Sequence, residues 1–232
     1  MNPKHDNVRH AFVLLMTLLA GCVDAVSFVN AGVFPANMSG NAIVLAVSLF
    51  SPGTIHREAH ASLALLGFCA GSAVAAMVIR SRQTVWSRSV NLVLLLAGLI
   101  LVAAGVAIAD AKATYSLGIL FLLAVAMGMQ AAAVLHLNFP GAGTTTAVTS
   151  TLTAVVTRAV HHLRGAMIPG FAIQLPSPVF PLLVFIVYFS GALIGGLQRG
   201  SHASVTTMLC GVLLAFVGLA AEFLTDKSAR SS

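Results

Sequence analysis

The sequence GCVDAVSFVNAGVFPANMSGN, residues 21–41, combines three features that decide how the chain folds. Asp24 stands inside a run of apolar residues, a Phe34-Pro35 pair breaks that run, and a short apolar segment, residues 41–50, follows. The residue before a proline is pushed towards extended backbone, so we expect the first helix to end before this pair. The segment after it has only about half of the residues that a spanning helix needs. The stretch therefore predicts a membrane-spanning helix followed by a half-helix.

The rest of the chain is as apolar as this stretch. The 232 residues are 58% hydrophobic and 8% charged, with a mean hydropathy of +0.97, whereas about a quarter of the residues in a soluble domain are charged. A second short segment, Thr144–Val160, follows Phe139-Pro140-Gly141. The sequence therefore predicts an all-α polytopic membrane protein, one integral domain over residues 1–232 with a short polar tail at 225–232. The long apolar runs, each near the ~20 residues of a spanning helix, are Ala11–Asn30, Ala61–Ile79, Val90–Ala109, Leu117–Leu137, Val179–Leu197 and Ala203–Leu224.

The positions of the Lys and Arg residues distinguish two topologies. If all eight apolar segments span, eight of these residues lie on the side of the N-terminus and four on the other. If the two short segments re-enter, the division is nine against three, with Arg57, Lys112 and Arg199 opposite the termini. Cytoplasmic loops are enriched in Lys and Arg. The charges therefore favour six spanning helices plus two short re-entrant half-helices, with both termini in the cytoplasm.

Residues 11–109 and 117–224 resemble each other weakly. Each part has a spanning run, a break, a short segment and a helix with small residues four apart. Three crossings per half is an odd number, so the halves must be inverted relative to each other across the membrane, an arrangement that recurs in transporters. Chance similarity of Ala- and Gly-rich segments is the alternative. The matching positions are Asp24-Ala25 with Gln130-Ala131, Asn30 with His136, and Phe34-Pro35-Ala36 with Phe139-Pro140-Gly141.

Four motifs at these positions resemble the YoaK family of bacterial inner-membrane proteins. They are Gly21-Cys22-Val23-Asp24-Ala25, Asn37-Met38-Ser39-Gly40-Asn41, Gly128-Met129-Gln130 and Thr144-Thr145-Thr146-Ala147-Val148-Thr149. The resemblance spans nearly the whole chain. It implies a six-helix protein of the bacterial inner membrane and adds no mechanism, because the family's function is unassigned. Family members usually have Thr in place of Ser39, which keeps the hydroxyl, and often Gly in place of Ser150, so that Ser150 tightens a close backbone contact.

Asp24 is the first candidate functional residue, because no other acidic residue lies deep in a predicted membrane segment. An ionisable side chain inside the bilayer costs about 3 kcal/mol on insertion scales and faces protein or water. Such residues serve as proton or cation coupling sites, and Asp24 could also be a gate hydrogen-bonded to the half-helix. The alternative is a structural carboxylate that caps the N-terminus of the opposing half-helix.

The polar starts of the two short segments are the second candidate. A helix N-terminus presents unpaired N–H groups and partial positive charge. If the segments re-enter from opposite faces, their starts meet near the middle of the membrane and bind a small polar solute or an anion. Ordinary helix capping is the alternative. We therefore predict a substrate site formed by Asp24, Asn37, Ser39, Asn41, Gln130, Thr145, Thr149 and Thr151.

Two further sets of residues have open roles. His136 is either a proton carrier, like Asp24, or a neutral histidine hydrogen-bonded within the bundle. The small-residue faces indicate close helix packing, which either holds the two halves together or joins two copies in a homodimer. The glycines concerned are Gly67, Gly71, Gly191 and Gly195.

Other classes of function find little support in the sequence. The net charge of +6 comes from short loops rather than a basic cluster with aromatic residues, which argues against nucleic-acid binding. There is no HExxH, GxSxG or phosphate-loop motif and no predicted cofactor or metal site, so we do not expect an enzyme. The leading hypothesis is a small-solute transporter or channel, and Asp24 is the candidate residue for coupling it to protons. The alternative is a membrane scaffold or accessory subunit that transports nothing.

Overall fold

The computed structural model describes residues 3–50, 55–79, 86–111, 115–137, 179–198 and 201–229, together with residues 153, 155–157 and 160. Within these residues the regular elements are α-helices, and six are long and apolar enough to cross a membrane, as expected. A seventh, α2 (Met38–Ser48), is too short. The six long helices are α1 (Pro3–Ala31), α3 (Ile55–Val78), α4 (Arg88–Asp110), α5 (Leu117–Leu137), α7 (Val179–Gly196) and α8 (Ser201–Ala229).

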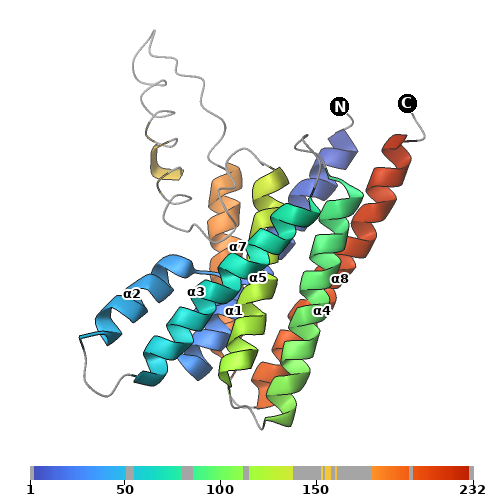
Figure 1. Ribbon diagram of the computed structural model, residues 1–232. Helices are drawn as coiled ribbons and strands as arrows, with labels where there is room; N and C mark the ends of the chain where they lie inside the picture. The colour runs from blue at the N-terminus through green and yellow to red at the C-terminus, as the bar shows by residue number, and fades with distance from the viewer. Residues whose placement is uncertain are drawn as a thin grey trace.

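The path of α2 is that of a re-entrant half-helix. In Figure 1, α2 begins near the mid-height of the bundle and descends to the end at which α1 finishes and α3 starts. The chain therefore enters the bundle after α1 and returns to the same side, which confirms the re-entrant arrangement for the first short segment. The second, Thr144–Val160, lies almost entirely outside the described residues.

The turn between α1 and α2 is set by a few local features. Gly32 has a φ of 75°, in the left-handed region that glycine adopts without strain, and its N–H donates to the carbonyl of Phe28 at 2.9 Å. Phe34 then stacks on Phe28, with ring centroids 4.5 Å apart. Asn37 caps the first turn of α2 by accepting from the N–H of Gly40. These contacts stop α1 and start α2 within six residues, 32–37.

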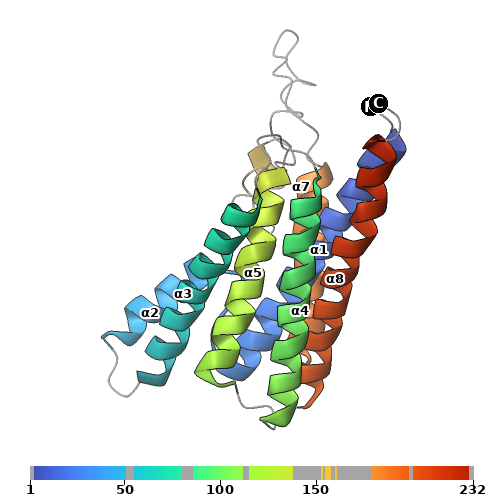
Figure 2. The ribbon, with the colours of Figure 1, turned by 45° about the vertical axis from the view of Figure 1, so that its right-hand side comes forward.

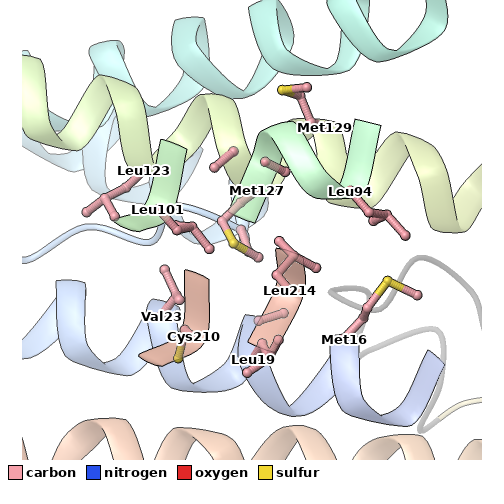
Figure 3. Close-up of a cluster of buried hydrophobic side chains, with 14 of the residues drawn as sticks. Met16, Leu19, Val23, Leu94, Leu101, Leu123, Met127, Met129, Cys210 and Leu214 are labelled. Atoms are coloured by element: carbon pink, nitrogen blue, oxygen red, sulfur yellow. The ribbon is translucent and has the colours of Figure 1, made fainter. Parts of the chain in front are cut away.

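The six long helices occupy three pairs of equivalent positions. The buried share of the most apolar stretch is 61% in α1 and 67% in α5. It is 44% in both α4 and α8, 28% in α3 and 22% in α7. Thus α1 and α5 are central, and α3 and α7 are peripheral. Figure 3 shows Met16, Leu94, Met127 and Leu214, from α1, α4, α5 and α8, meeting in the core.

The two halves of the chain exchange helices. The first helix of the first half, α1, packs on α7 of the second half, whereas α5 of the second half packs on α3 of the first. The third helices, α4 and α8, pack on each other. Figures 1 and 2 place both termini at one end of the bundle, so α1 and α5 run in opposite directions, as three crossings per half require. The pairing is that of an inverted repeat.

Glycines make these exchanged contacts close. A Cβ added to Gly71 would lie 2.0 Å from the carbonyl oxygen of Val125 on α5, and one added to Gly195 would lie 2.2 Å from that of Cys22 on α1. Gly67 and Gly191 make equivalent contacts one turn earlier. The sequence left open whether these four glycines join the halves or join two copies. They are buried against the opposite half of the same chain, so they are not free for a homodimer contact.

Two helices are longer than the apolar runs predicted. α1 begins at Pro3 rather than near residue 11, and α8 continues to Ala229, through most of the tail expected at 225–232. A helix ends where glycine, proline or a capping residue stops it, rather than where hydrophobicity ends. Hydropathy therefore locates the part of each helix that lies in the bilayer and underestimates the length of the whole helix.

Candidate functional site

Asp24 is buried in α1, 2% exposed, about two turns before the helix ends. Its Oδ1 accepts a hydrogen bond from the backbone N–H of Ala36 at 2.7 Å. The N–H of Asn37 also faces the carboxylate. These are the last two residues before α2, where the helix presents partial positive charge. The carboxylate therefore binds the entry segment of α2, residues 32–37, which belongs to its own half of the chain.

The second carboxylate oxygen of Asp24 binds the other half of the chain. Tyr188 of α7 donates its hydroxyl to Oδ2 at 2.8 Å. Tyr188 stands three residues before Gly191, in the part of α7 that packs closest to α1: a Cβ added to Gly21 would lie 2.2 Å from the carbonyl oxygen of Tyr188. Asp24 thus connects three elements, namely α1, the entry segment and α7.

Asn41 holds the entry segment in shape. Its Oδ1 accepts from the backbone N–H of Phe34 at 2.8 Å, and its Nδ2 donates to the carbonyl oxygen of the same residue. The side chain is 0% exposed. Both polar groups of the amide are therefore used inside the chain in this conformation, and Asn41 positions backbone rather than presenting itself to a solute.

Asn37 and Ser39 form the start of α2. The Asn37 side chain accepts from the N–H of Gly40 at 3.3 Å and from the hydroxyl of Ser39 at 2.7 Å. Ser39 itself is exposed. Capping accounts for the polar contacts of both side chains, whereas the exposed position of Ser39 leaves its hydroxyl near any solute at this helix end.

Gln130 is buried on α5, at the place that the repeat matches with Asp24. Its Nε2 donates to the carbonyl oxygen of Met16 on α1 at 2.8 Å, and its side chain is 0% exposed. Its Oε1 has no hydrogen-bond donor among the described residues. An unpaired buried acceptor costs about 1–3 kcal/mol, so a donor from outside the described residues would stabilise this oxygen.

The remaining predicted residues fall into two groups. His136, near the end of α5, is half-buried, and its Nε2 has no partner among the described residues. Asn30, the residue matched with it, donates to the carbonyls of Val26 and Gln198. Thr145, Thr149 and Thr151 lie outside the described residues.

The structure brings part of the predicted site together. Asp24, Asn37, Ser39 and Asn41 surround one helix entry. Gln130 is held at Met16, eight residues before Asp24, which is about 12 Å along the axis of α1. Asp24 and Gln130 are therefore two separate polar positions along α1, rather than neighbours in one cluster: Asp24 binds the entry segment and α7, whereas Gln130 reaches α1 from α5.

A comparison with known protein families matches residues 12–220 to a family described as a protein of unknown function, DUF1275. The chain belongs to the DUF1275 family. No curated protein and no solved structure matches it. The family assignment covers both halves of the bundle, together with Asp24, the entry segment and Tyr188.

In this DUF1275 protein, Tyr188 is a site residue that the sequence alone did not predict. The chain has two tyrosines, and one of them lies in an apolar segment, Val179–Leu197. A buried tyrosine hydroxyl needs a hydrogen-bond partner. The lone deep carboxylate, Asp24, is the acceptor that such a hydroxyl seeks. Pairing the two residues requires knowing that α7 packs on α1, which the order of the helices along the chain does not reveal.

Proposed function

We propose that this protein is a transporter or channel for a small polar solute, and not an enzyme. The observation that carries the proposal is the start of α2, which lies at the mid-height of the bundle against the buried carboxylate of Asp24. Broken helices that begin near the middle of the membrane, in a protein made of inverted repeats, form the binding sites of many transporters.

The entry segment explains why such an arrangement favours a solute path. Residues 32–37 lack the regular backbone hydrogen bonds of a helix, and lipid offers none in exchange. Irregular backbone is tolerated at this depth only where protein or a water-filled cavity satisfies it. Asp24 and Asn41 satisfy part of this backbone. A polar solute at the α2 start would meet the exposed hydroxyl of Ser39 there.

The charge of Asp24 narrows the class of solute. Its carboxylate already accepts the N–H of Ala36 at the positive end of α2. An anion would compete for the same donor and meet a like charge, which is unfavourable in a medium of low dielectric constant. Of the two classes expected from the sequence, a neutral polar solute therefore suits this entry better than an anion.

Coupling to protons belongs to the same proposal. Protonation of Asp24 would neutralise the carboxylate and weaken the charge-assisted hydrogen bonds from Ala36 and Tyr188. A proton would thus loosen the entry segment and α7 together. We further propose that Gln130, His136 and the hydroxyls of Thr145, Thr149 and Thr151 serve the path in the second half.

The kind of membrane is inferred from the family resemblance, and the orientation of the protein in it from the distribution of charge. The YoaK resemblance is compatible with the family assignment and suggests the bacterial inner membrane. The excess of Lys and Arg on the side of the termini suggests that both termini are cytoplasmic.

The experiment is a solute screen followed by a flux assay. Purified protein is tested for thermal stabilisation by neutral polar solutes, cations and anions, since a ligand of the folded state raises its stability. Hits are then measured for uptake into proteoliposomes with and without a proton gradient, with Asp24→Asn as the matched variant. Flux of a neutral solute supports the proposal. Absence of flux, combined with loss of a partner complex on deletion, favours the accessory-subunit alternative.

A further inference from the structure

We propose that the hydrogen bond from Tyr188 to Asp24 is a latch between the two halves of the chain that controls access to the start of α2. The proposal rests on the proposed transport function and adds its regulation. Its basis is the position of Asp24 at the junction of three elements, one of which, α7, comes from the opposite half.

The two oxygens of the Asp24 carboxylate bind different parts of the chain. Oδ1 binds the entry segment through Ala36, and Oδ2 binds α7 through Tyr188. Because both bonds end on one rigid carboxylate, the Tyr188 hydroxyl fixes the orientation of the group that holds the entry segment. Loss of the Tyr188 bond frees the Asp24 side chain to change rotamer, and the entry segment then loses its anchor.

The helices that carry the Tyr188 bond are packed through glycines. A Cβ on Gly191 would lie 2.0 Å from the carbonyl of Leu18, and one on Gly195 would lie 2.2 Å from that of Cys22. With smooth glycine faces in contact, helices can slide along each other, a motion known from domain closure. Dispersion contacts survive a small slide, whereas a hydrogen bond weakens steeply with distance and angle. Two hydrogen bonds therefore resist a slide of α7 along α1: the Tyr188 bond to Asp24, and the bond from Asn30 to the carbonyl of Gln198, just after the end of α7. The Tyr188 bond is the one that also fixes the entry segment, because Asp24 holds Ala36.

The two halves of the chain differ at the position of this bond. Gln130 matches Asp24, and α3 packs on α5 as α7 packs on α1. The hydroxyl that α3 contributes to α5, from Ser72, donates to the backbone carbonyl of Gly128 at 3.2 Å. It does not reach Gln130, whose Oε1 has no donor in the described part of the chain. Among the described residues, the latch is thus a feature of the α2 entry alone.

The test measures access to the latch without any solute. Ser27 is 1% exposed and lies three residues after Asp24, on the same face of α1. In a background in which Cys22, Cys69 and Cys210 are replaced by alanine, Ser27→Cys places a nearly isosteric thiol beside the latch. Its rate of reaction with N-ethylmaleimide is measured in proteoliposomes. The comparison includes Tyr188→Phe and a control, Ser190→Ala, which removes an α7 hydroxyl bonded within its own helix to Ile186.

We expect Tyr188→Phe to accelerate labelling about tenfold, which corresponds to a shift of ~1.4 kcal/mol towards the open arrangement. Ser190→Ala should leave the rate unchanged. In an Asp24→Asn background the effect of Tyr188→Phe should shrink, because the two changes act on one bond. If Tyr188→Phe does not yield folded protein, Asp24→Asn alone must accelerate labelling for the latch to stand, because its neutral amide makes a weaker hydrogen bond to Tyr188 than the carboxylate does.

A lower melting temperature with an unchanged labelling rate would show that Tyr188 is merely structural and would overturn the latch. That outcome leaves the transport proposal intact, because flux is measured separately. Conversely, accelerated labelling in a protein that carries no solute would keep the latch as a conformational switch and remove the transport function.

Discussion

At the scale of single residues, the fold uses one carboxylate to organise irregular backbone in the middle of the bundle. Asp24 accepts from Ala36 and Tyr188, and Asn41 binds both polar groups of the Phe34 backbone. In lipid these groups would otherwise lack partners. The two side chains differ in one respect. Asp24 carries a charge that can change and joins separate elements, whereas Asn41 is neutral and binds Phe34 and Met38, within its own segment.

The first prediction concerns the charge of Asp24. Asp24→Asn should preserve insertion and folding, because the amide oxygen can still accept from Ala36 and the amide N–H can donate to the Tyr188 oxygen. It should abolish any pH-dependent flux, since the titrating group is gone. The measurement is flux against pH in proteoliposomes, with gel filtration to verify folding. Failure of Asp24→Asn to accumulate as folded protein would make the carboxylate structural and end the coupling idea.

The second prediction separates positioning from capping at the start of α2. Asn41→Ala leaves the N–H and carbonyl of Phe34 without partners and should destabilise the protein by about 2–4 kcal/mol. Ser39→Ala removes an exposed hydroxyl that donates to the Asn37 side chain and should cost less than about 1 kcal/mol. Thermal unfolding of the two purified variants measures the difference. Equal effects would contradict the role given to Asn41.

The third prediction keeps the shared site open to test. If the two half-helix starts bind one solute, the double change Asn41→Ala, Thr149→Val should weaken solute binding, and its effect on the binding free energy should differ from the sum of the two single effects. The measurement is solute affinity of the single and double variants. Strictly additive effects would indicate that the two starts do not share a ligand.

At the scale of elements, the contact between α1 and α7 is the one that delivers Tyr188 to Asp24. It depends on glycine, because the two backbones approach so closely that Gly21, Gly191 and Gly195 leave no room for a Cβ. Small residues at helix contacts in membranes act in this way, since lipid supplies no hydrophobic force to bring helices together.

The fourth prediction compares two neighbouring glycines of α7. Gly195→Ala forces a Cβ against the carbonyl of Cys22 and should destabilise the protein by about 1–3 kcal/mol, because the helices must move apart. Gly196→Ala meets no heavy atom within 4 Å and should be neutral or slightly stabilising. Thermal unfolding tests both variants, and the latch labelling assay should respond to Gly195→Ala alone. Similar behaviour of the two would refute the close contact.

At the scale of the whole molecule, the bundle is built from two exchanged halves. The first helix of each half packs on a helix of the other half, so neither half can bury its central helix by itself. Both termini lie at one end, together with the end of α3 and the start of α4 (Figures 1 and 2). The fold therefore agrees with the topology in which α2 re-enters.

The fifth prediction concerns the orientation of this bundle. Single cysteines at positions 82 and 164 should be labelled from the cytoplasmic side and those at 57 and 112 from the outside, because the loops rich in Lys and Arg stay inside. A membrane-impermeant maleimide applied to intact cells makes the measurement. External labelling at position 82 would reject the six-span orientation.

The sequence by itself determined the class of fold, because each spanning helix must be long and apolar whatever it packs against. Hydropathy located six spans, the Phe34-Pro35 pair marked the break, and the burial cost of a charge singled out Asp24. The partners of these residues were decided by the tertiary structure alone. Tyr188 is 164 residues from Asp24 in the chain, and Gln130 is 114 from Met16. Which helices touch depends on how glycine faces from opposite halves fit together. The residue pattern of one helix does not reveal which other helix it fits.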